Sequence, residues 1–236
     1  MKTKKTKFRL PVPIEFSLIM LVSLGYLIFS AFAWATIDPN SQAVLNYGND
    51  DILQILFYEF TVLLIVMGIL KWQGWSISSI GFSISLRKLT AGLAMFVISY
   101  FLYVIVFRLF GDFVLNLKIL DNSANENITY TVSANLLPLI LFSLINPFFE
   151  EFILVGYIVT AVRDKMSLFG CLILSVGFRL AFHVYQGPII LLSILPTGIM
   201  FTLYYWYKGN LIPSIIAHSL LDFLSFFVFI TIENSV

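Results

Sequence analysis

The chain has 236 residues, of which 59% are hydrophobic and 11% are charged, and its formal net charge is +1. A soluble domain carries roughly 25% charged residues, so this composition excludes an ordinary soluble enzyme, a disordered protein and a nucleic-acid-binding protein. The single cysteine, Cys171, excludes a disulfide framework and a thiolate metal site. The sequence therefore predicts an all-α polytopic protein of the lipid bilayer, because its apolar runs are continuous rather than alternating.

Seven apolar runs approach the length of about 20 residues that a bilayer crossing needs. They lie near residues 14–36, 52–70, 90–110, 134–160, 167–186, 188–206 and 211–231. The fourth contains Pro147, which predicts a kink or a partly re-entrant segment. The stretch 74–89 is too polar to span, and we expect it to lie in the interface as an amphipathic half-helix. Since no repeat or linker divides the chain, we expect one transmembrane domain over 1–236, with N-terminal spans in 1–133 and a core in 134–231.

Basic residues are distributed unevenly between the two sides of these runs. Cytoplasmic loops of membrane proteins keep Lys and Arg, so we expect the N-terminus to be cytoplasmic and the C-terminus to lie outside. One side holds Lys2, Lys4, Lys5, Lys7, Arg9, Lys71, Arg87, Lys88, Arg163, Lys165 and Lys208, whereas the opposite loops hold only Lys118. The alternative for the first run is a cleaved signal peptide that ends at Ala31-Phe32-Ala33.

Seven costly side chains lie within the apolar runs, where an ionisable group costs about 2.5–3.5 kcal/mol even on the most lenient scale. We interpret Glu59 as a structural residue that pairs with Arg108. The other six form three pairs on three separate runs, and their co-occurrence predicts one shared polar site. These pairs are Glu150 with Glu151, Arg179 with His183, and His218 with Asp222. The last two pairs are spaced four residues apart, so each shares one face of its helix.

The residue types in these pairs favour hydrolysis inside the membrane. Adjacent Glu150 and Glu151 point about 100° apart on a helix, so one can act at a site while the other supports it. Two neutral imidazoles, His183 and His218, with one carboxylate form the ligand set of a catalytic zinc site. Alternatively, a buried carboxylate acts as a general base on water without a metal. Asp222 would orient His218 by accepting its second N–H.

These motifs, taken together and in this order, resemble the CPBP family of CAAX proteases and bacteriocin-processing intramembrane proteases, also called Abi. The resemblance covers about 140–225 and is carried by EEFILVGY at 150–157, FRLAFHVYQG at 178–187 and HSLLD at 218–222. It implies a helix bundle with the active site among its four C-terminal spans and a CPBP-like catalytic core at 134–231. It further implies an intramembrane endopeptidase activity, of the metalloprotease or the glutamate type.

The resemblance also implies roles for single residues. Glu150 corresponds to the glutamate that activates water, and Glu151 to its supporting partner. His183 and His218 correspond to the histidines regarded as metal ligands or transition-state stabilisers, and Asp222 fills the Asn/Asp position of the third motif. Glu150, His183 and His218 would hold the metal if one is bound, with Zn²⁺ expected, and the family pattern leaves a metal-free mechanism open.

Two positions depart from the family pattern. Val155 stands where the family has an arginine, one turn after the glutamate pair, and Arg179 stands where it has a phenylalanine. We hypothesise that Arg179 pairs with Glu151, or with Glu150, and replaces the missing arginine from the next helix.

The depth of the three key residues presents one difficulty. Counted from the nearest basic residue on the predicted cytoplasmic side, helix rise places Glu150 at about 19 Å, His218 at about 15 Å and His183 at about 27 Å. A flat arrangement therefore puts His183 nearer the outer face. Tilt, a kink at Pro147, or a fifth helix that starts inside the boundary would close the gap, and the side on which the site opens stays undecided.

Four hypotheses for function follow. The leading one is an endopeptidase that hydrolyses a membrane-associated or lipidated peptide, in bacterial peptide processing or bacteriocin self-immunity at the plasma membrane. The missing arginine and phenylalanine favour instead a non-catalytic immunity or binding protein that keeps the fold. A haem protein would use His183 and His218 as axial ligands. A proton-coupled transporter fits poorly, because internal repeats are absent. The sequence identifies neither the substrate nor the oligomeric state.

Overall fold

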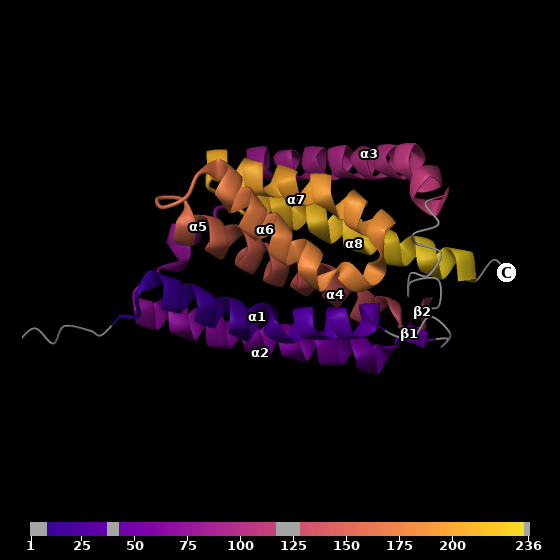
Figure 1. The fold of residues 1–236 in the computed structure, drawn as a ribbon, viewed down its shortest axis with the longest axis horizontal. Helices are drawn as coiled ribbons and strands as arrows, with labels where there is room; N and C mark the ends of the chain where they lie inside the picture. The colour runs from indigo at the N-terminus through magenta and orange to yellow at the C-terminus, as the bar shows by residue number, and fades with distance from the viewer. Residues whose placement is uncertain (1–8, 37–42, 117–127, 234–236) are drawn as a thin grey trace, which may run out of the picture.

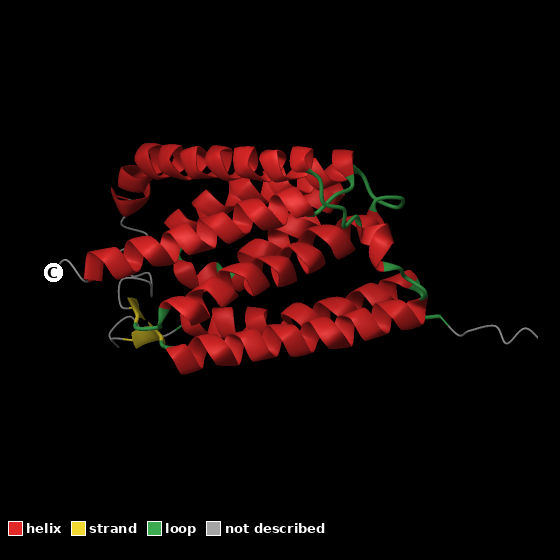
Figure 2. Ribbon diagram, turned by 180° about the vertical axis from the view of Figure 1, so that it is seen from behind, coloured by secondary structure: helices red, strands yellow, loops and turns green. Residues whose placement is uncertain are grey.

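The computed structural model describes residues 9–36, 43–116 and 128–233. Its helices run alongside one another as a bundle, with α3 along one edge and α1 and α2 along the other (Figure 1). The helices are α1 (Val12–Ala35), α2 (Asn49–Gln73), α3 (Leu86–Asn116), α4 (Leu136–Glu150), α5 (Ile158–Val162), α6 (Leu168–Phe182), α7 (Pro188–Lys208) and α8 (Ile212–Glu233). The π-helix η4 (Glu151–Tyr157) joins α4 to α5, and the 3₁₀ turns η1 (Ile77–Ile80) and η5 (Val184–Gln186) precede α3 and α7. The view from behind shows the same helical layers (Figure 2).

Helix length and composition confirm the predicted membrane bundle. In the described part of the chain, five helical segments are long and apolar enough to cross a membrane, and two shorter apolar helices, Leu168–Phe182 and Ile212–Val228, accompany them. Each of the seven matches one predicted run. Large apolar side chains point outward along these helices, including Phe29 and Phe57, which are each 74% exposed. Such an apolar surface would cause aggregation in water, whereas it is compatible with contact to lipid acyl chains.

The fourth span crosses the bundle without re-entering, which corrects one of the two expectations for Pro147. Leu136–Val162 is one continuous segment of 27 residues, and Pro147 lies inside α4. A proline removes one backbone donor and crowds the preceding turn, and four residues later the helix widens into η4. The helix therefore accommodates Pro147 by a π-helical segment, a feature that is often found at functional sites.

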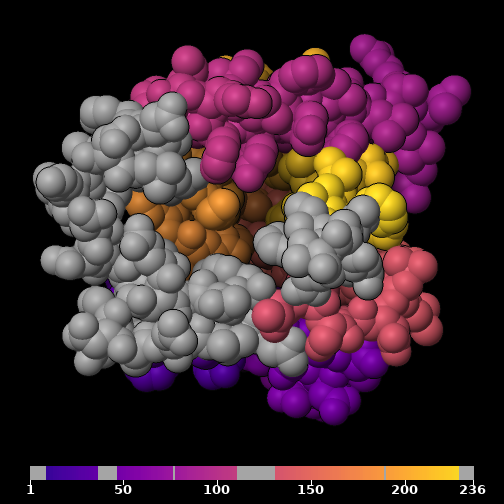
Figure 3. Space-filling model, turned by 90° about the vertical axis from the view of Figure 1, so that its right-hand side faces the viewer, coloured from indigo at the N-terminus to yellow at the C-terminus, as the bar shows by residue number. Residues whose placement is uncertain are grey.

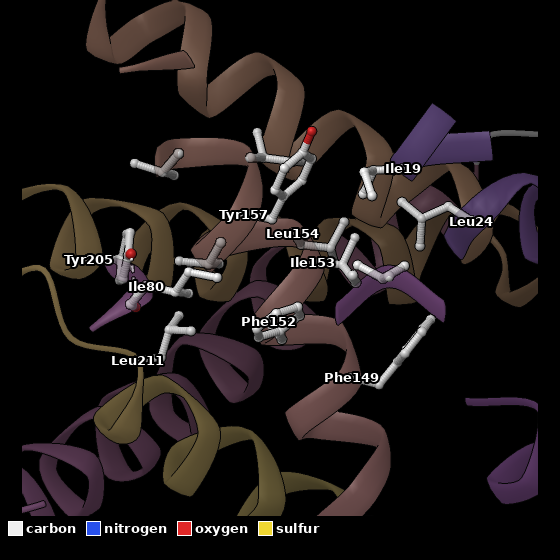
Figure 4. Packing of buried hydrophobic residues seen from close by; sticks show 14 of the residues in the cluster. Ile19, Leu24, Ile80, Phe149, Phe152, Ile153, Leu154, Tyr157, Tyr205 and Leu211 are labelled. Atoms are coloured by element: carbon white, nitrogen blue, oxygen red, sulfur yellow. Dashed lines mark hydrogen bonds between the residues drawn. The ribbon is translucent and has the colours of Figure 1, made fainter. Parts of the chain in front are cut away.

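The π-helix η4 forms the middle of the core, since all seven of its residues are buried. Figure 4 shows Ile153 and Leu154 of η4 near Ile19 and Leu24 of α1. Ile80 and Leu211 lie on the other side of η4 in the same view. Ile19 and Leu24 are fully buried, so α1 is an integral part of this bundle. In a membrane, such contacts stabilise the fold by van der Waals packing rather than by removing apolar surface from water.

The basic ends of the helices gather at one end of the bundle. The Arg163 guanidinium after α5 lies 5.3 Å from the centre of the Trp206 ring near the end of α7. The backbone N–H of Leu10 donates to Gln73 Oε1 at the end of α2, at 3.1 Å. This arrangement agrees with the predicted charge asymmetry, whereas Lys2, Lys4, Lys5, Lys7 and Lys118 lie outside the described residues.

The polar stretch 74–89 differs from the expected half-helix. It contains the single 3₁₀ turn η1, and its remainder up to α3 is irregular. Ile80 is only 1% exposed, and its carbonyl accepts a 2.9 Å hydrogen bond from the Tyr205 hydroxyl. The Gly81 carbonyl accepts from Asn210 Nδ2 at 2.8 Å and from the Leu211 N–H at 3.2 Å. The stretch is therefore tied to the turn between α7 and α8.

Gly81 provides a stability prediction. Its φ is +78°, and a Cβ there would lie 2.0 Å from the Gly209 carbonyl oxygen. We expect Gly81→Ala to destabilise the protein by about 1–3 kcal/mol or more, because the left-handed backbone and the backbone clash both oppose a side chain. Unfolding of the purified protein in detergent would measure the loss. Gly177→Ala is the matched control, since a Cβ added there would meet nothing within 4 Å; equal stability of the two variants would contradict the prediction.

Two short strands were not predicted from the sequence. β1 (Ala43–Tyr47) pairs in parallel with β2 (Ile128–Val132), so the two predicted outer loops are joined at the end opposite the basic helix ends (Figure 1). Val132 packs with Ile52, Leu56 and Leu139 in a small separate apolar cluster. Seen from this end, α3 lies above and the N-terminal helices below, with α7 and α8 between them (Figure 3).

Candidate active site

The three predicted pairs of polar residues converge inside the bundle. Glu150 ends α4 and Glu151 begins η4. Arg179 lies in the last turn of α6, and His183 is the residue at which that helix stops. His218 and Asp222 lie one turn apart on α8. The six side chains are linked by a continuous chain of ion-pair contacts of 2.7–3.9 Å, so the predicted shared polar site exists as a geometric cluster.

Arg179 bridges the two adjacent glutamates. Its Nη1 lies 3.2 Å from Glu150 Oε2 and its Nη2 lies 2.7 Å from Glu151 Oε1. The three side chains are 4%, 5% and 0% exposed. The predicted pairing of Arg179 with a glutamate is therefore confirmed, and the contact extends to both acids. A planar guanidinium suits this task because its donors are spaced to serve two carboxylates.

Gly198 of α7 makes room for the guanidinium. A Cβ at this position would lie 3.3 Å from Arg179 Cδ and 3.4 Å from Arg179 Nε. The guanidinium carbon also lies 6.0 Å from the centre of the Phe201 ring, which covers one side of it. The α7 backbone therefore shapes the site without contributing a charge.

His218 lies between two carboxylates. Its Nδ1 is 2.8 Å from Glu151 Oε1, and its Nε2 is 3.4 Å from Asp222 Oδ1. Since an ionised carboxylate only accepts hydrogen bonds, Nδ1 donates to Glu151 when that acid is ionised, and Nε2 faces Asp222. Asn146 Nδ2 donates to the second Asp222 oxygen at 3.1 Å. Asn146 was missed from the sequence, although its spacing of four residues before Glu150 places it on the same helix face.

His183 approaches the other glutamate without a direct hydrogen bond. Its Nε2 lies 3.9 Å from Glu150 Oε1, beyond normal hydrogen-bond distance. The depth difference expected from a flat arrangement is wrong, because this contact brings the two residues together. α6 begins at Leu168, after a loop that follows α5, and its C-terminal end lies beside the junction of α4 and η4.

The expected pair between Glu59 and Arg108 is wrong. Glu59 is 2% exposed and Arg108 is exposed on α3, and no ion pair joins them among the described residues. One oxygen of Glu59, Oε2, has no hydrogen-bond partner. The carboxyl instead interacts electrostatically with Glu150, Asp222 and His218. It is therefore an additional acid near the cluster, contributed by a helix that the motifs do not include.

The cluster contains donors that fit a metal ion. Glu150, Glu151 and His218 each offer one ligand atom, and these three atoms lie within 4.8 Å of one another. The buried Glu151 Oε2 has no hydrogen-bond partner. This set contains Glu151 where the sequence predicted His183. Carboxylate and imidazole ligands suit Zn²⁺, although a metal here would displace the proton that His218 shares with Glu151.

Comparisons with known proteins extend this result. The model of the family described as type II CAAX prenyl endopeptidase Rce1-like matches residues 132–224. This range contains every member of the cluster described above, except Glu59, and confirms the resemblance indicated by the motifs. No curated protein and no solved structure matches the chain in the other two comparisons. Over residues 132–224, this membrane protein therefore matches the Rce1-like family of type II CAAX prenyl endopeptidases.

Proposed function

We propose that this protein is an intramembrane endopeptidase that hydrolyses a membrane-associated or lipidated peptide. The observation that carries the proposal is the contact network in which two buried glutamates and one buried arginine meet two partly buried histidines. Burying so many ionisable groups in a membrane is costly, and such groups generally mark a functional site. The family match supports peptide-bond cleavage as the reaction.

Glu150 is the proposed general base. Arg179 holds its Oε2, whereas its Oε1 faces His183 Nε2 across 3.9 Å. A water bound between these two atoms would give one proton to Glu150 Oε1 while its oxygen attacks the carbonyl carbon of the peptide bond. Glu150 would then return this proton to the amide nitrogen as the carbon–nitrogen bond breaks. One carboxyl group thus serves as base and then as acid.

The remaining charged residues are proposed to set the electrostatic environment of the site. Arg179 is buried and His218 is partly buried, and with His218 as an imidazolium these two cations would face the carboxylates of Glu150, Glu151 and Asp222. Fixed charges in a dry site cost no reorganisation during the reaction. Glu151 would therefore act through its two cationic partners, while Asn146 holds Asp222.

The same donors support a metal-assisted variant of the proposal. Glu150, Glu151 and His218 would hold the ion, and the ion would supply Lewis-acid polarisation of water or of the carbonyl. Measuring bound metal in protein purified without chelators, together with hydrolysis after chelator treatment, separates the two variants.

The site bears on two competing hypotheses. The non-catalytic hypothesis depended on the missing arginine and phenylalanine, and Arg179, which stands at the phenylalanine position, supplies a guanidinium to both acids. The haem hypothesis needs a free nitrogen on each histidine, yet both nitrogens of His218 face carboxylates. For the biological setting we propose peptide processing or bacteriocin self-immunity in a bacterial plasma membrane, on the motif resemblance alone.

The proposed function can be tested with purified protein in lipid vesicles. We expect cleavage at one bond of a prenylated peptide anchored in the same vesicles, and at least tenfold slower cleavage of the same peptide without its lipid. Mass spectrometry of the products identifies the bond. Equal cleavage of the soluble peptide would contradict the membrane-substrate proposal, and no cleavage of any peptide in a prenylated and acylated panel would contradict the enzyme proposal.

A further inference from the structure

The backbone after α6 places one amide side chain beside His183. The helix stops at His183, and η5 returns the chain so that the Gln186 N–H donates to the His183 carbonyl at 2.9 Å. Gly187 follows with φ of +88°, a value that favours glycine. The tight turn therefore holds Gln186 against the imidazole from three residues away.

The amide of Gln186 meets the nitrogen of His183 that faces away from Glu150. Its Oε1 lies 3.1 Å from His183 Nδ1, and its Nε2 donates to the Tyr185 hydroxyl at 3.3 Å. In this orientation the amide oxygen faces the ring. Because an amide oxygen only accepts hydrogen bonds, the contact is a hydrogen bond when Nδ1 carries the hydrogen.

This assignment determines what His183 presents to Glu150. A neutral imidazole has one N–H, so a hydrogen on Nδ1 leaves a lone pair on Nε2. Nε2 and Glu150 Oε1 are then two acceptors that face each other 3.9 Å apart. Two acceptors do not bond directly, whereas a water between them can donate one hydrogen to each.

We propose that Gln186 is a positioning residue that fixes His183 in its Nδ1–H tautomer and aims the Nε2 lone pair at the water held by Glu150. The inference rests on the proposed function, because it assigns Gln186 a task in water activation. A purely structural Gln186 would stabilise the turn after α6 without setting the tautomer.

The test uses three variants and two readouts. Gln186→Leu removes the acceptor, Gln186→Glu keeps it, and Gln54→Leu on the exposed face of α2 is the matched control. The first readout is the ¹⁵N and ¹³C signature of the ring, recorded in vesicles with labelled histidine. The chain has only two histidines, so a His183→Asn sample identifies the signals. The second readout is kcat and KM for the cleaved peptide.

We expect an Nδ1–H tautomer for His183 in the unchanged protein. In Gln186→Leu we expect a shift toward the Nε2–H form, with kcat lowered about 10–100-fold and KM changed less than twofold, as is typical when an orienting partner is lost. Gln186→Glu should retain the Nδ1–H signal and more of the kcat than Gln186→Leu, and Gln54→Leu should behave as the unchanged protein.

Two results would overturn the inference. One is an Nε2–H tautomer in the unchanged protein, and the other is a Gln186→Leu variant with the original signals and kcat. Thermal unfolding of each variant separates a loss of fold from a loss of positioning. If Glu150→Gln proves fully active, the proposed function fails instead, and the tautomer readout still tests whether Gln186 orients His183.

Discussion

Replacing Glu150 with Gln is expected to lower the rate of peptide cleavage by about 10²–10⁴-fold, the contribution typical of a general base. Glutamine has almost the same shape, and its carbonyl oxygen can still accept the hydrogen bond that Arg179 Nη1 gives to Oε2 at 3.2 Å. An amide does not take a proton from water, so the chemical step is lost while the fold remains. Initial rates with the vesicle-anchored peptide, together with thermal unfolding of the same samples, measure both parts.

Glu15→Gln is the matched control for this prediction. Glu15 is a buried glutamate of α1, 6% exposed, and its Oε1 accepts a hydrogen bond from the Tyr157 hydroxyl at 3.3 Å. The Glu15→Gln substitution makes the same chemical change at a buried position outside the cluster. We expect this control to keep at least half of the cleavage rate, and a Glu150→Gln variant that performs as well would refute the assigned role of Glu150.

The sequence predicted the bundle because apolar runs and helical spacing depend on local properties. Runs of about 20 apolar residues define spans almost independently of their neighbours. The pairs spaced by four residues had to share a face of one helix. These two rules were enough to locate the seven helical segments and the cluster on α4, α6 and α8.

Features that depend on contacts between distant segments were not predicted. β1 and β2 are more than 80 residues apart in their register, with Ala43 opposite Ile128; Ile128–Val132 consists of β-favouring residues, but its sequence does not identify its partner. The stretch 74–89 looked amphipathic, but hydrogen bonds to Tyr205 and Asn210 determine its path. In both cases the competing interaction is tertiary, and the local pattern carries no information about it.

Within the site, charge was easier to predict than neutral hydrogen bonding. Arg179 stood out because a buried guanidinium needs an acidic partner. Asn146 and Gln186 are uncharged and common in loops and helix ends, so their contacts with Asp222 and His183 gave no signal strong enough to use. Glu59 was noticed but assigned the wrong partner, because helix α3 presents Arg108 outward.

Replacing Arg179 with Phe is expected to lower the free energy of unfolding by about 3–5 kcal/mol, the usual loss when one partner of a buried ion pair is removed. Glu150 and Glu151 would then lie buried without their shared cation. Adding Val155→Arg should restore part of the stability and part of any lost cleavage rate, because position 155 lies about one turn after Glu151 within η4.

Val155→Arg alone should destabilise the protein, since it adds a second cation at a fully buried position. Unfolding in detergent for the four proteins gives a double-mutant cycle. A double variant no more stable and no more active than Arg179→Phe would show that the arginine cannot be exchanged between the two helices.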